Sequence, residues 1–320
     1  MLCRNSCSIN VPALSKEVRA IDALIKEISF IKDYRDIVKI NKGFSADEKY
    51  RIRMVAEQQD MLLRLFSIPE LEQKKLEYAV MEQMQQLGIR CSKPLAIGKA
   101  GDKGYIITSY LAGEDAEYAL PHYSPEEQFA VGFEAGMELR NMHQHEAPAE
   151  MSSWAARKTA KHRKYLAAYA DCGMKIRNDQ KIIDFIEERI HLMDGRPNLF
   201  QHDDYHPGNL IVKDGKFAGV VDFGRHDWGD PFHEFLKGGL FSRGQSIPFS
   251  IGQIKGYFHE SEPDDIFWEL YSLYLAMCVF SSVVWSLKLM PEDMDDMLEK
   301  IYRLLDDHDY FDRIKPKWYS

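Results

Sequence analysis

The side chains best suited to chemistry stand between residues 202 and 224. His202, Asp204 and Asn209 form an H-x-D-x-x-x-x-N pattern, and an Asp-Phe-Gly motif begins at Asp222, thirteen residues after Asn209. Transfer of a phosphoryl group from a nucleotide needs metal ions that neutralise the phosphates, and such ions prefer hard oxygen ligands. Asn209 and Asp222 are therefore predicted metal ligands. Asp204 is the predicted catalytic base, which orients an acceptor hydroxyl and takes its proton.

A predicted β-hairpin brings these residues together. Leu210-Ile211-Val212 and residues 217–221 have the composition of two short strands, and Asp214-Gly215 between them is a strong hairpin signal. The hairpin would hold the loop with Asp204 and Asn209 beside the end of the strand that presents the second aspartate. The first motif alone is only moderately specific, but an Asp-Phe-Gly after a hairpin of the right length argues against coincidence. His202 is expected to pack and hydrogen-bond within the loop.

The residues from His202 to Asn209, with Val221–Arg225 and Gly229-Asp230-Pro231, resemble the aminoglycoside phosphotransferase family of kinase-like small-molecule phosphotransferases. The resemblance extends over residues 35 to 310 and implies an α+β, two-lobed, protein-kinase-like fold. The N-terminal lobe would contain an antiparallel sheet plus a helix and bind the nucleotide, over residues 1–110 with a flexible tail at 1–14. The mainly helical C-terminal lobe, residues 111–320, would hold the catalytic and substrate-binding residues.

The resemblance also implies a set of nucleotide-binding residues. In such folds a loop between the first two strands covers the phosphates, a strand supplies a basic residue that pairs with a glutamate on the following helix, and a connector faces the adenine through its backbone. These residues are Gly43 and Ser45, Arg64 and Glu77, and Ser109 and Leu111. Protein kinases usually have lysine where Arg64 stands, so the phosphate contact is expected to differ. An ordinary hairpin would also explain Gly43 and Ser45, and backbone contacts do not separate ATP from GTP.

The predicted elements alternate as this fold requires. The strands are expected at 36–40, 50–55, 61–66, 94–98 and 105–110, and the helices at 15–31, 70–86, 124–144, 153–172, 179–193 and from 266 onwards. Helix 70–86 has a predicted apolar stripe through Leu76, Val80, Met84 and Leu87. Ser124 and Glu127 form a capping box, and His143 is expected to be a core or capping residue. Helix 153–172 carries a basic run, interpreted as a solvated face, with a site for an acidic ligand as the alternative.

Composition favours a folded cytoplasmic enzyme. The 320 residues are 45% hydrophobic and 28% charged, the five cysteines are scattered as reduced thiols would be, and no signal peptide is visible. Leu273 to Trp285 is apolar but too short to span a bilayer, so a buried helix is expected. The net charge is −9 and no basic tract resembles a nucleic-acid footprint. We therefore expect neither a membrane nor a nucleic acid as partner.

The acceptor is predicted to be a small cationic molecule. In the family that the chain resembles, carboxylates line the acceptor cleft and hold amino groups, and the candidates here are Asp227, Glu234, Glu262, Asp264 and Asp265. Helix capping would also explain the two aspartates at 264 and 265. The predicted reaction transfers the γ-phosphate of ATP or GTP, with Mg²⁺, to a hydroxyl of a cationic antibiotic such as an aminoglycoside. Asp230 is expected to be structural.

Three alternatives remain at this stage. The acceptor could be a metabolic alcohol or amino sugar of the choline, fructosamine or homoserine type, or a macrolide. A protein kinase is disfavoured because only eight residues separate Asp222 from Asp230, which leaves no room for an activation segment. A nucleotide-binding protein without catalysis is supported by Arg64 alone. The acceptor's identity, the hydroxyl modified and the oligomeric state stay open.

Overall fold

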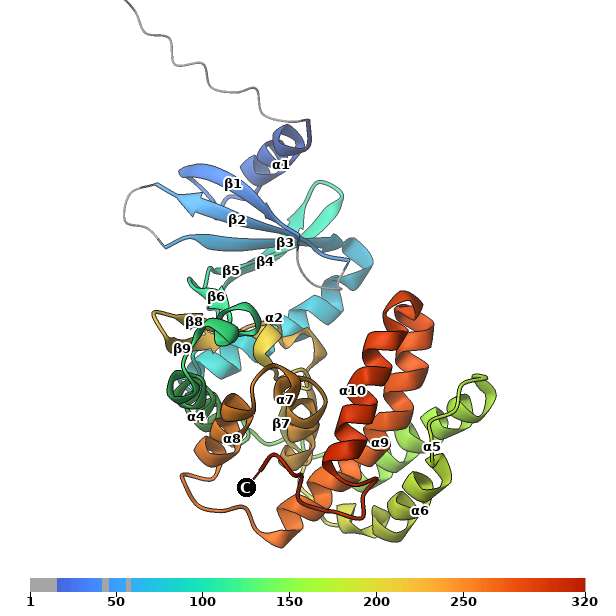
Figure 1. The fold of residues 1–320 in the computed structure, drawn as a ribbon. Helices are drawn as coiled ribbons and strands as arrows, with labels where there is room; N and C mark the ends of the chain where they lie inside the picture. The colour runs from blue at the N-terminus through green and yellow to red at the C-terminus, as the bar shows by residue number, and fades with distance from the viewer. Residues whose placement is uncertain (1–15, 42–45, 56–58, 320) are drawn as a thin grey trace, which may run out of the picture. The chain divides into compact units, whose positions relative to one another are not determined.

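The computed structural model describes residues 16–41, 46–55 and 59–319 (Figure 1). The chain divides into two compact units, which are described separately. Unit 1 comprises residues 1–79 and 93–110, and unit 2 comprises residues 80–92 and 111–320. The predicted assignment of nucleotide binding to residues 1–110 and of catalysis to 111–320 stays a prediction.

Unit 1 is built on one five-stranded antiparallel sheet with the order β1-β2-β3-β5-β4. Its core lies between the sheet and α1, where Ile25 and Ile28 pack against Ile52 and Leu63. These residues are β-branched or large and apolar, which suits a half-buried sheet face. The five predicted strands are confirmed. The elements are α1 (Lys16–Glu27), β1 (Tyr34–Ile40), β2 (Glu48–Met54), β3 (Met61–Ser67), β4 (Pro94–Ala100) and β5 (Lys103–Ser109).

Helix α2 (Leu71–Gln86) follows the turn η1 (Ile68–Glu70) and exposes a different face from the predicted one. Val80 and Met84 are buried as expected, but Leu76 is 64% exposed. The buried face passes instead through Glu77, which is 4% exposed. The predicted stripe was wrong at Leu76 because Glu77 turns inward to meet a basic partner in β3, and neighbouring helical residues point about 100° apart. Leu87 lies beyond the end of the helix and is also exposed.

Unit 2 contains two helices in direct backbone contact, α4 (Pro125–Met142) and α8 (Ile247–Tyr257). A Cβ added at Gly136 of α4 would stand 2.0 Å from the carbonyl oxygen of Gln253, and one at Gly256 of α8 would stand 2.0 Å from that of Phe133. Only glycine permits this approach. The predicted capping box at the start of α4 is confirmed: Ser124 and Glu127 exchange hydrogen bonds of 2.8 and 3.2 Å.

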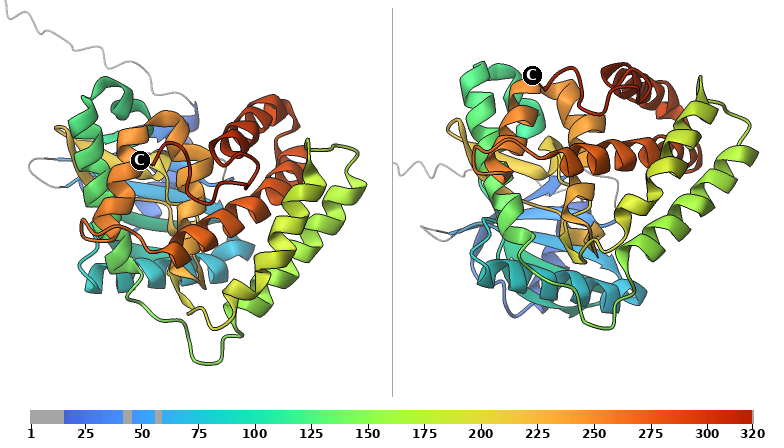
Figure 2. Two further views of the ribbon diagram at one scale, coloured as in Figure 1. Left: turned by 60° about the horizontal axis from the view of Figure 1, so that its bottom comes forward. Right: turned by 90° about the horizontal axis from the view of Figure 1, so that it is seen from below.

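The remaining long helices of unit 2 form a separate layer. Helices α5 (Trp154–Asp171) and α6 (Asp179–Arg189) lie beside α9 (Asp265–Leu289), and α10 (Met294–Asp307) follows α9 (Figure 2). Short helical segments complete the unit: α3 (Ala116–Ala119), η2 (Leu120–His122), η3 (Ile190–Met193), η4 (Pro207–Asn209), η5 (Phe223–Arg225), η6 (Pro231–Phe235), η7 (Gly238–Ser242), α7 (Arg243–Gln245) and η8 (Pro291–Asp293).

Helix α9 is longer than its apolar centre. Its 25 residues, with a mean hydropathy of 1.7 in the most apolar window, are long and apolar enough to cross a membrane by length and composition. Because 72% of that window is buried inside the protein, this is only weak evidence for a membrane span. The helix begins at Asp265, next to its predicted start at 266, and extends the apolar stretch Leu273 to Trp285 at both ends. The prediction of a buried helix is confirmed.

Two small sheets of unit 2 frame the segment 202–224. Strands β8 (Leu210–Lys213) and β9 (Lys216–Val220) pair as a hairpin and add β6 (Glu114–Asp115), while β7 (Leu199–Gln201) pairs with β10 (Asp227–Gly229). Asp214 and Gly215 have φ of 52° and 74°, as a two-residue hairpin turn with positive φ at both positions requires. The predicted hairpin is confirmed. The loop 202–209 leaves β7 and enters β8, and Asp222 follows β9.

Candidate active site

The catalytic loop 202–209 is tied to the segment that carries Asp222. The Nε2 atom of His202 lies 3.0 Å from the carbonyl oxygen of Val221, and the backbone N–H of Val221 donates to the carbonyl of Asn209 over 3.0 Å. His202 is fully buried, with its ring edge-on to that of Phe223. The predicted packing role of His202 is confirmed, and its effect is to hold the loop and the second aspartate in one rigid piece.

Asn209 and Asp204 are joined within that loop. The Nδ2 atom of Asn209 donates to the carbonyl oxygen of Asp204 over 2.9 Å and lies 3.2 Å from its Oδ2 atom. The amide oxygen of Asn209 is therefore directed away from Asp204. Asp222 is exposed and has φ of 68°, in the left-handed region that non-glycine residues rarely adopt outside turns and functional sites. Its carboxylate has no hydrogen bond or ion pair with any described residue.

These two oxygen donors fit a magnesium ion. Among the residues that the structure describes, no group of three or more His, Cys, Asp and Glu side chains could enclose a metal ion. Mg²⁺ does not need such a cage, because it usually keeps waters and binds one or two protein oxygens together with substrate phosphates. The amide oxygen of Asn209 and the unpaired carboxylate of Asp222 match this chemistry. Their assignment as metal ligands stays a prediction.

Sequence reasoning missed Lys237, the closest cation to the predicted base. Its Nζ atom donates to Oδ1 of Asp204 over 2.8 Å, while His206 Nε2 lies 3.6 Å from Oδ1 and Arg225 Nη1 lies 3.9 Å from Oδ2. Burial alone would raise the pKa of Asp204, but Lys237, His206 and Arg225 lower it well below its usual range. Asp204 is thus held as a carboxylate. The available signal was a single lysine in the otherwise apolar run from Phe235 to Leu240.

The buried carboxylate of Glu234 supports the predicted catalytic loop through hydrogen bonds to its backbone. Its carboxylate accepts the backbone N–H of Asp203 over 3.2 Å and that of Tyr205 over 3.4 Å, and Glu234 is 2% exposed. His143 lies 3.9 Å from the same carboxylate and, at 4% exposure, is the predicted core residue. The position of Glu234 suits an anchor of the loop. Its predicted contact with an acceptor is not tested by these bonds.

Asp230 has the buried structural position that the sequence predicts. Arg196 binds both carboxylate oxygens over 2.7 and 2.8 Å, and the hydroxyl of Tyr274 donates to Oδ2 over 2.7 Å. Asp230 accepts in addition from the backbone N–H of Phe232, so it caps the segment η6. The carboxylate is completely buried and fully bonded, which confirms its structural role.

The other predicted acceptor carboxylates have partners or positions of their own. Asp227 pairs with Arg157 over 3.2 Å, and Asp264 caps α9 by accepting from the backbone N–H of Phe267 over 2.9 Å. Glu262 is exposed and forms an ion pair with Lys255. Asp265 is exposed in the first turn of α9. The structure gives Asp264 the capping role that was the alternative, while acceptor binding by these residues stays a prediction.

Unit 1 contains a separate cluster centred on Arg64. The predicted pairing with Glu77 is confirmed: Nη1 and Nη2 of Arg64 reach the two carboxylate oxygens, the second over 3.3 Å. Asp47, which sequence reasoning missed, accepts from Arg64 over 2.6 and 3.0 Å and from Lys74 over 2.6 Å. Burial would raise the pKa of Asp47, but the two cations lower it. A role of Arg64 and Glu77 in nucleotide binding stays a prediction.

The other predicted nucleotide contacts are described only in part. Gly43 and Ser45 lie outside the residues that the structure describes. Ser109 donates its backbone N–H to the carbonyl of Lys93 over 2.8 Å, and its hydroxyl accepts from the backbone N–H of Lys93 over 2.8 Å. A nucleotide contact at Ser109 would therefore use its carbonyl group. Leu111 is half-buried, and its predicted contact with adenine is untested.

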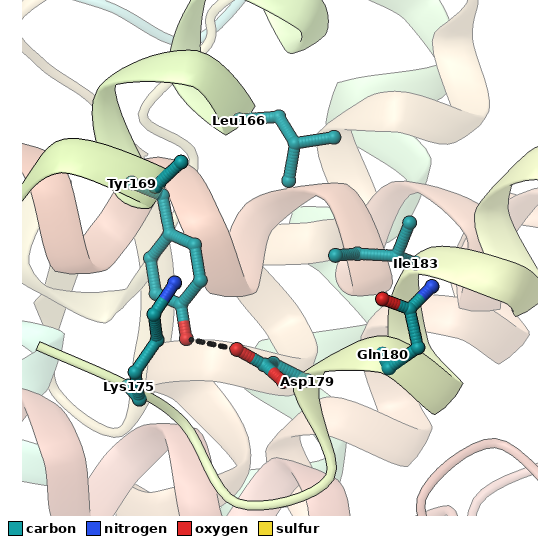
Figure 3. Close-up of a pocket in the computed structure, with 7 residues that line it drawn as sticks. Leu166, Tyr169, Lys175, Asp179, Gln180 and Ile183 are labelled. Carbon is teal, nitrogen blue, oxygen red and sulfur yellow. Dashed lines mark hydrogen bonds between the residues drawn. The ribbon is translucent and has the colours of Figure 1, made fainter.

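A pocket of about 490 Å³ between α5 and α6 does not belong to this site (Figure 3). Tyr169 in its wall donates to Asp179 over 3.0 Å and accepts from the backbone N–H of Ile176 over 2.6 Å. Lys175 lies over the ring of Tyr169 at 4.8 Å. The pocket is lined by no predicted site residue, and these polar groups are already bonded, so it is a surface feature of the helix pair.

Known structures share this fold. A thermostable mutant of aminoglycoside phosphotransferase APH(4)-Ia in its apo form has a TM-score of 0.65 at 15% identity and covers 88% of this chain and 96% of its own. The ADP-bound aminoglycoside phosphotransferase APH(2'')-Ib has a TM-score of 0.61 at 16% identity and covers 96% and 99%. At these identities the similarity shows the fold alone, and it confirms the predicted α+β class.

The sequence itself also matches a family model. No curated protein matches the chain. The model of the phosphotransferase enzyme family, APH, matches residues 36–267, which is more than two thirds of the 320 residues and includes the catalytic loop and Asp222. The match confirms the resemblance seen in the motifs. The chain therefore belongs to the phosphotransferase enzyme family.

Proposed function

We propose that the protein transfers the γ-phosphoryl group of ATP or GTP to a hydroxyl group of a small molecule. In this step the acceptor oxygen forms a bond to phosphorus, the bond from phosphorus to the β-phosphate oxygen breaks, and the nucleoside diphosphate leaves. Asp204 accepts the proton of the hydroxyl. The observation that carries the proposal is the arrangement of Asp204, Asn209 and Asp222 in one connected loop system, in which no described residue pairs with the carboxylate of Asp222.

The chain's own residues have distinct tasks in this proposal. Asp204 orients the acceptor hydroxyl, and Lys237 orients Asp204 and keeps it ionised. Glu234 fixes the backbone of the loop, so the base is held in place before the acceptor binds. A magnesium ion held by Asn209 and Asp222 would supply charge neutralisation at the transferring phosphate. Phosphoryl transfer has little covalent chemistry for the protein to perform, so positioning and charge supply most of the acceleration.

An aminoglycoside is one acceptor class that has support. The net charge of −9 favours cationic ligands, and similar structures include a ternary complex of APH(4)-Ia with ADP and hygromycin B and a complex of APH(2")-IIa with gentamicin. The support does not extend to three of the five acceptor carboxylates named above. Asp227 and Glu262 are paired with basic residues, and Glu234 is buried under the loop.

A nucleotide-binding protein without turnover has one observation in its favour. Arg64 is already bonded to Asp47 and Glu77 at 9% exposure, so phosphate oxygens would have to compete for its guanidinium group. The intact set of Asp204, Asn209 and Asp222 argues for catalysis. The two functions differ in one measurable quantity, the rate of nucleoside diphosphate release with a hydroxyl acceptor.

The test is a coupled assay of ADP and GDP release. Purified protein with Mg²⁺ and either ATP or GTP would be given aminoglycosides, other cationic antibiotics, macrolides, and metabolic alcohols of the choline and homoserine type. We expect release that depends on one acceptor and that disappears in the Asp204→Asn variant. Nucleotide binding without acceptor-dependent release would contradict the proposal and support the protein without turnover.

A further inference from the structure

The surroundings of Asp204 are unexpectedly basic for a site that would bind a polycation. Besides Lys237 and Arg225, two lysines of α5, Lys158 and Lys161, act on the neighbouring carboxylate Asp203. Burial raises the pKa of Asp203, while Lys237, Lys161 and Lys158 act in the opposite direction. Four basic side chains thus act on Asp203 and Asp204, while Glu234 is a third carboxylate of this region. Arg157 is also a basic residue of α5, but it is paired with Asp227 and does not add to the excess of positive charge.

The ammonium group of Lys158 has a histidine as its hydrogen-bond partner. Its Nζ atom is 2.6 Å from Nε2 of His233, and burial followed by the charge of Lys161 lowers the pKa of Lys158 to about 8. Burial lowers the pKa of His233 well below its usual range, so its ring is neutral and accepts from the ammonium group. Lys158 therefore has a neutral hydrogen-bond partner and no carboxylate within ion-pair distance among the described residues.

His233 extends this arrangement toward the catalytic loop. It is 5% exposed, and its Nδ1 atom has no hydrogen-bond partner in the described chain. The nearest carboxylate oxygen, Oδ1 of Asp203, lies 3.8 Å from Nδ1, which is too long for a hydrogen bond. Buried polar atoms are nearly always bonded. An unpaired donor and an ammonium group without a carboxylate partner, both near Asp203, the residue before the predicted base, together indicate a site for a ligand acceptor group.

Four aromatic rings of this region already have a basic side chain of the protein beside them. Lys158 lies 5.7 Å from the ring of Trp154 and 5.9 Å from that of Tyr274. Likewise, Arg225 lies 5.8 Å from the ring of Trp285, and Lys237 lies 5.4 Å from the ring of Phe241. Since the protein's own cations already occupy positions over these rings, a ligand ammonium group would meet like charges there.

We infer that the acceptor of this phosphotransferase carries an anionic group, a carboxylate or a phosphate, which Lys158 binds together with Lys161 and His233 while Asp204 receives the acceptor hydroxyl. The inference rests on the proposed function, because it assigns the second end of the molecule whose hydroxyl Asp204 orients. It selects the acidic-ligand alternative for the basic run of α5. The net charge of the whole chain is −9, but a ligand responds to the local charge at its binding site, and the charge around Lys158 and Lys161 differs from that total.

The experiment measures binding at the acceptor site without requiring turnover. The protein is saturated with Mg²⁺ and AMP-PNP, so that anions cannot enter the nucleotide site. Calorimetry then gives Kd values for four matched three-carbon probes: glycerol 3-phosphate, glycerate, glycerol and 2-amino-1,3-propanediol. We expect at least one of the two anions to bind about tenfold more tightly than glycerol, and the amine most weakly, because charge-assisted hydrogen bonds outweigh neutral ones. The two anions distinguish a phosphate from a carboxylate.

Variants of α5 make the test specific. Lys158→Met should remove the preference for the anion and leave glycerol binding unchanged, whereas Lys158→Arg should retain a preference. Lys164→Gln is the matched control, because Lys164 is an exposed lysine of the same helix that does not act on Asp203 or His233. Thermal unfolding of each variant checks that it folds.

The outcomes separate the two proposals. Equal binding of the four probes, no binding of any, tighter binding of the amine, or an anion preference that survives in Lys158→Met overturns the anionic acceptor. Failure of AMP-PNP to bind, or absence of nucleoside diphosphate release with every acceptor, contradicts the proposed function instead. Phosphorylation of aminoglycosides, with no preference for anionic probes, would keep the proposed function and reject this inference.

Discussion

Two clusters of charged side chains, one in each unit, differ in their balance of charge and in their exposure. In unit 1, Arg64 and Lys74 face Asp47 and Glu77, and all four side chains are 3% to 11% exposed. In unit 2, the cations around Asp204 outnumber the carboxylates, and exposure ranges from 14% for Lys237 to 48% for Arg225. In the cluster of unit 1, which we call the closed cluster, the side chains are buried and the opposite charges balance. In the cluster of unit 2, which we call the open cluster, cations are in excess and partly exposed, so they can bind a ligand.

The difference has a consequence for each predicted binding site. In the closed cluster, a nucleotide phosphate would compete with Asp47 and Glu77 for Arg64, so it would gain less than a full ion pair. In the open cluster, an incoming anion can meet Lys158, whose hydrogen-bond partner is the neutral His233, and gains a larger net interaction. The comparison therefore predicts a structural effect of mutations in unit 1 and a functional effect in unit 2.

The largest effect is expected for Asp204→Asn. The amide keeps the size of the side chain and its bond to the loop but cannot take the acceptor proton, so kcat should fall by roughly 10² to 10⁴. Nucleotide affinity should stay within about threefold, because Asp204 is predicted to contact the acceptor and not the nucleotide. Steady-state kinetics and nucleotide titration measure the two quantities. Near-full turnover in the variant would remove Asp204 from its predicted role.

Arg64→Met tests the closed cluster. It leaves Asp47 and Glu77 buried beside a single remaining cation, and breaking a buried pair costs about 3 to 5 kcal/mol of unfolding free energy. Urea unfolding of the variant gives the loss. The double variant Arg64→Met with Asp47→Asn removes one of the stranded charges and should recover part of it. A loss below about 1 kcal/mol would mean that the cluster is as weakly coupled as exposed ion pairs.

Asn209→Ala and Asp222→Ala test the predicted metal ligands. Each removes one hard oxygen, so we expect the Mg²⁺ concentration for half-maximal activity to rise by about tenfold or more. Excess Mg²⁺ should restore part of the rate, in contrast to Asp204→Asn. Asp227→Ala is the control, since that carboxylate follows the same segment but is paired with Arg157. Metal titrations that coincide with those of the parent protein would place the ligands elsewhere.

The sequence predicted residues whose type is fixed by chemistry and missed those whose role depends on packing. The catalytic loop, the hairpin and the Arg64–Glu77 pair follow from motif spacing and strand pattern. Lys237 and Asp47 could not be found in this way, because a lone lysine or aspartate has no spacing signature and acquires its partner only when distant segments fold together. The exposed Leu76 has the same cause, since the ion pair of Glu77 decided which face of α2 is buried.

Lys237→Met measures what the missed lysine contributes. The variant loses the 2.8 Å bond that orients Asp204, but His206 and Arg225 remain near the carboxylate. We therefore expect kcat to fall by about tenfold, less than for Asp204→Asn, with nucleotide KM unchanged. Lys237→Arg should recover part of kcat because it keeps a donor. A change in KM alone, or no recovery with arginine, would argue that Lys237 binds substrate and does not position the base.

The smallest expected effect is a dependence of anion affinity on pH, which distinguishes the open cluster from an ordinary exposed lysine. Burial, followed by Lys161, lowers the pKa of Lys158 to about 8, so its charge is present below pH 8 and is lost above it. Glycerate remains a monovalent anion throughout this range. Its Kd should therefore rise by about fourfold between pH 7 and pH 8.5, the loss expected from the protonated fraction of a group with this pKa.

Controls must account for every charged group that faces Lys158. His233 stays neutral because its pKa lies well below its usual value, while Asp203 and Asp227 act to raise the pKa of Lys158. Cys278 faces Lys158 from α9, so the measurement is repeated in Cys278→Ser. Glycerol binding should not change with pH, and glycerate binding to Lys158→Met should be flat. If the pH dependence persists in Lys158→Met but disappears in Cys278→Ser, the thiol and not the lysine controls anion binding. The two clusters would then differ in the exposure of their side chains alone.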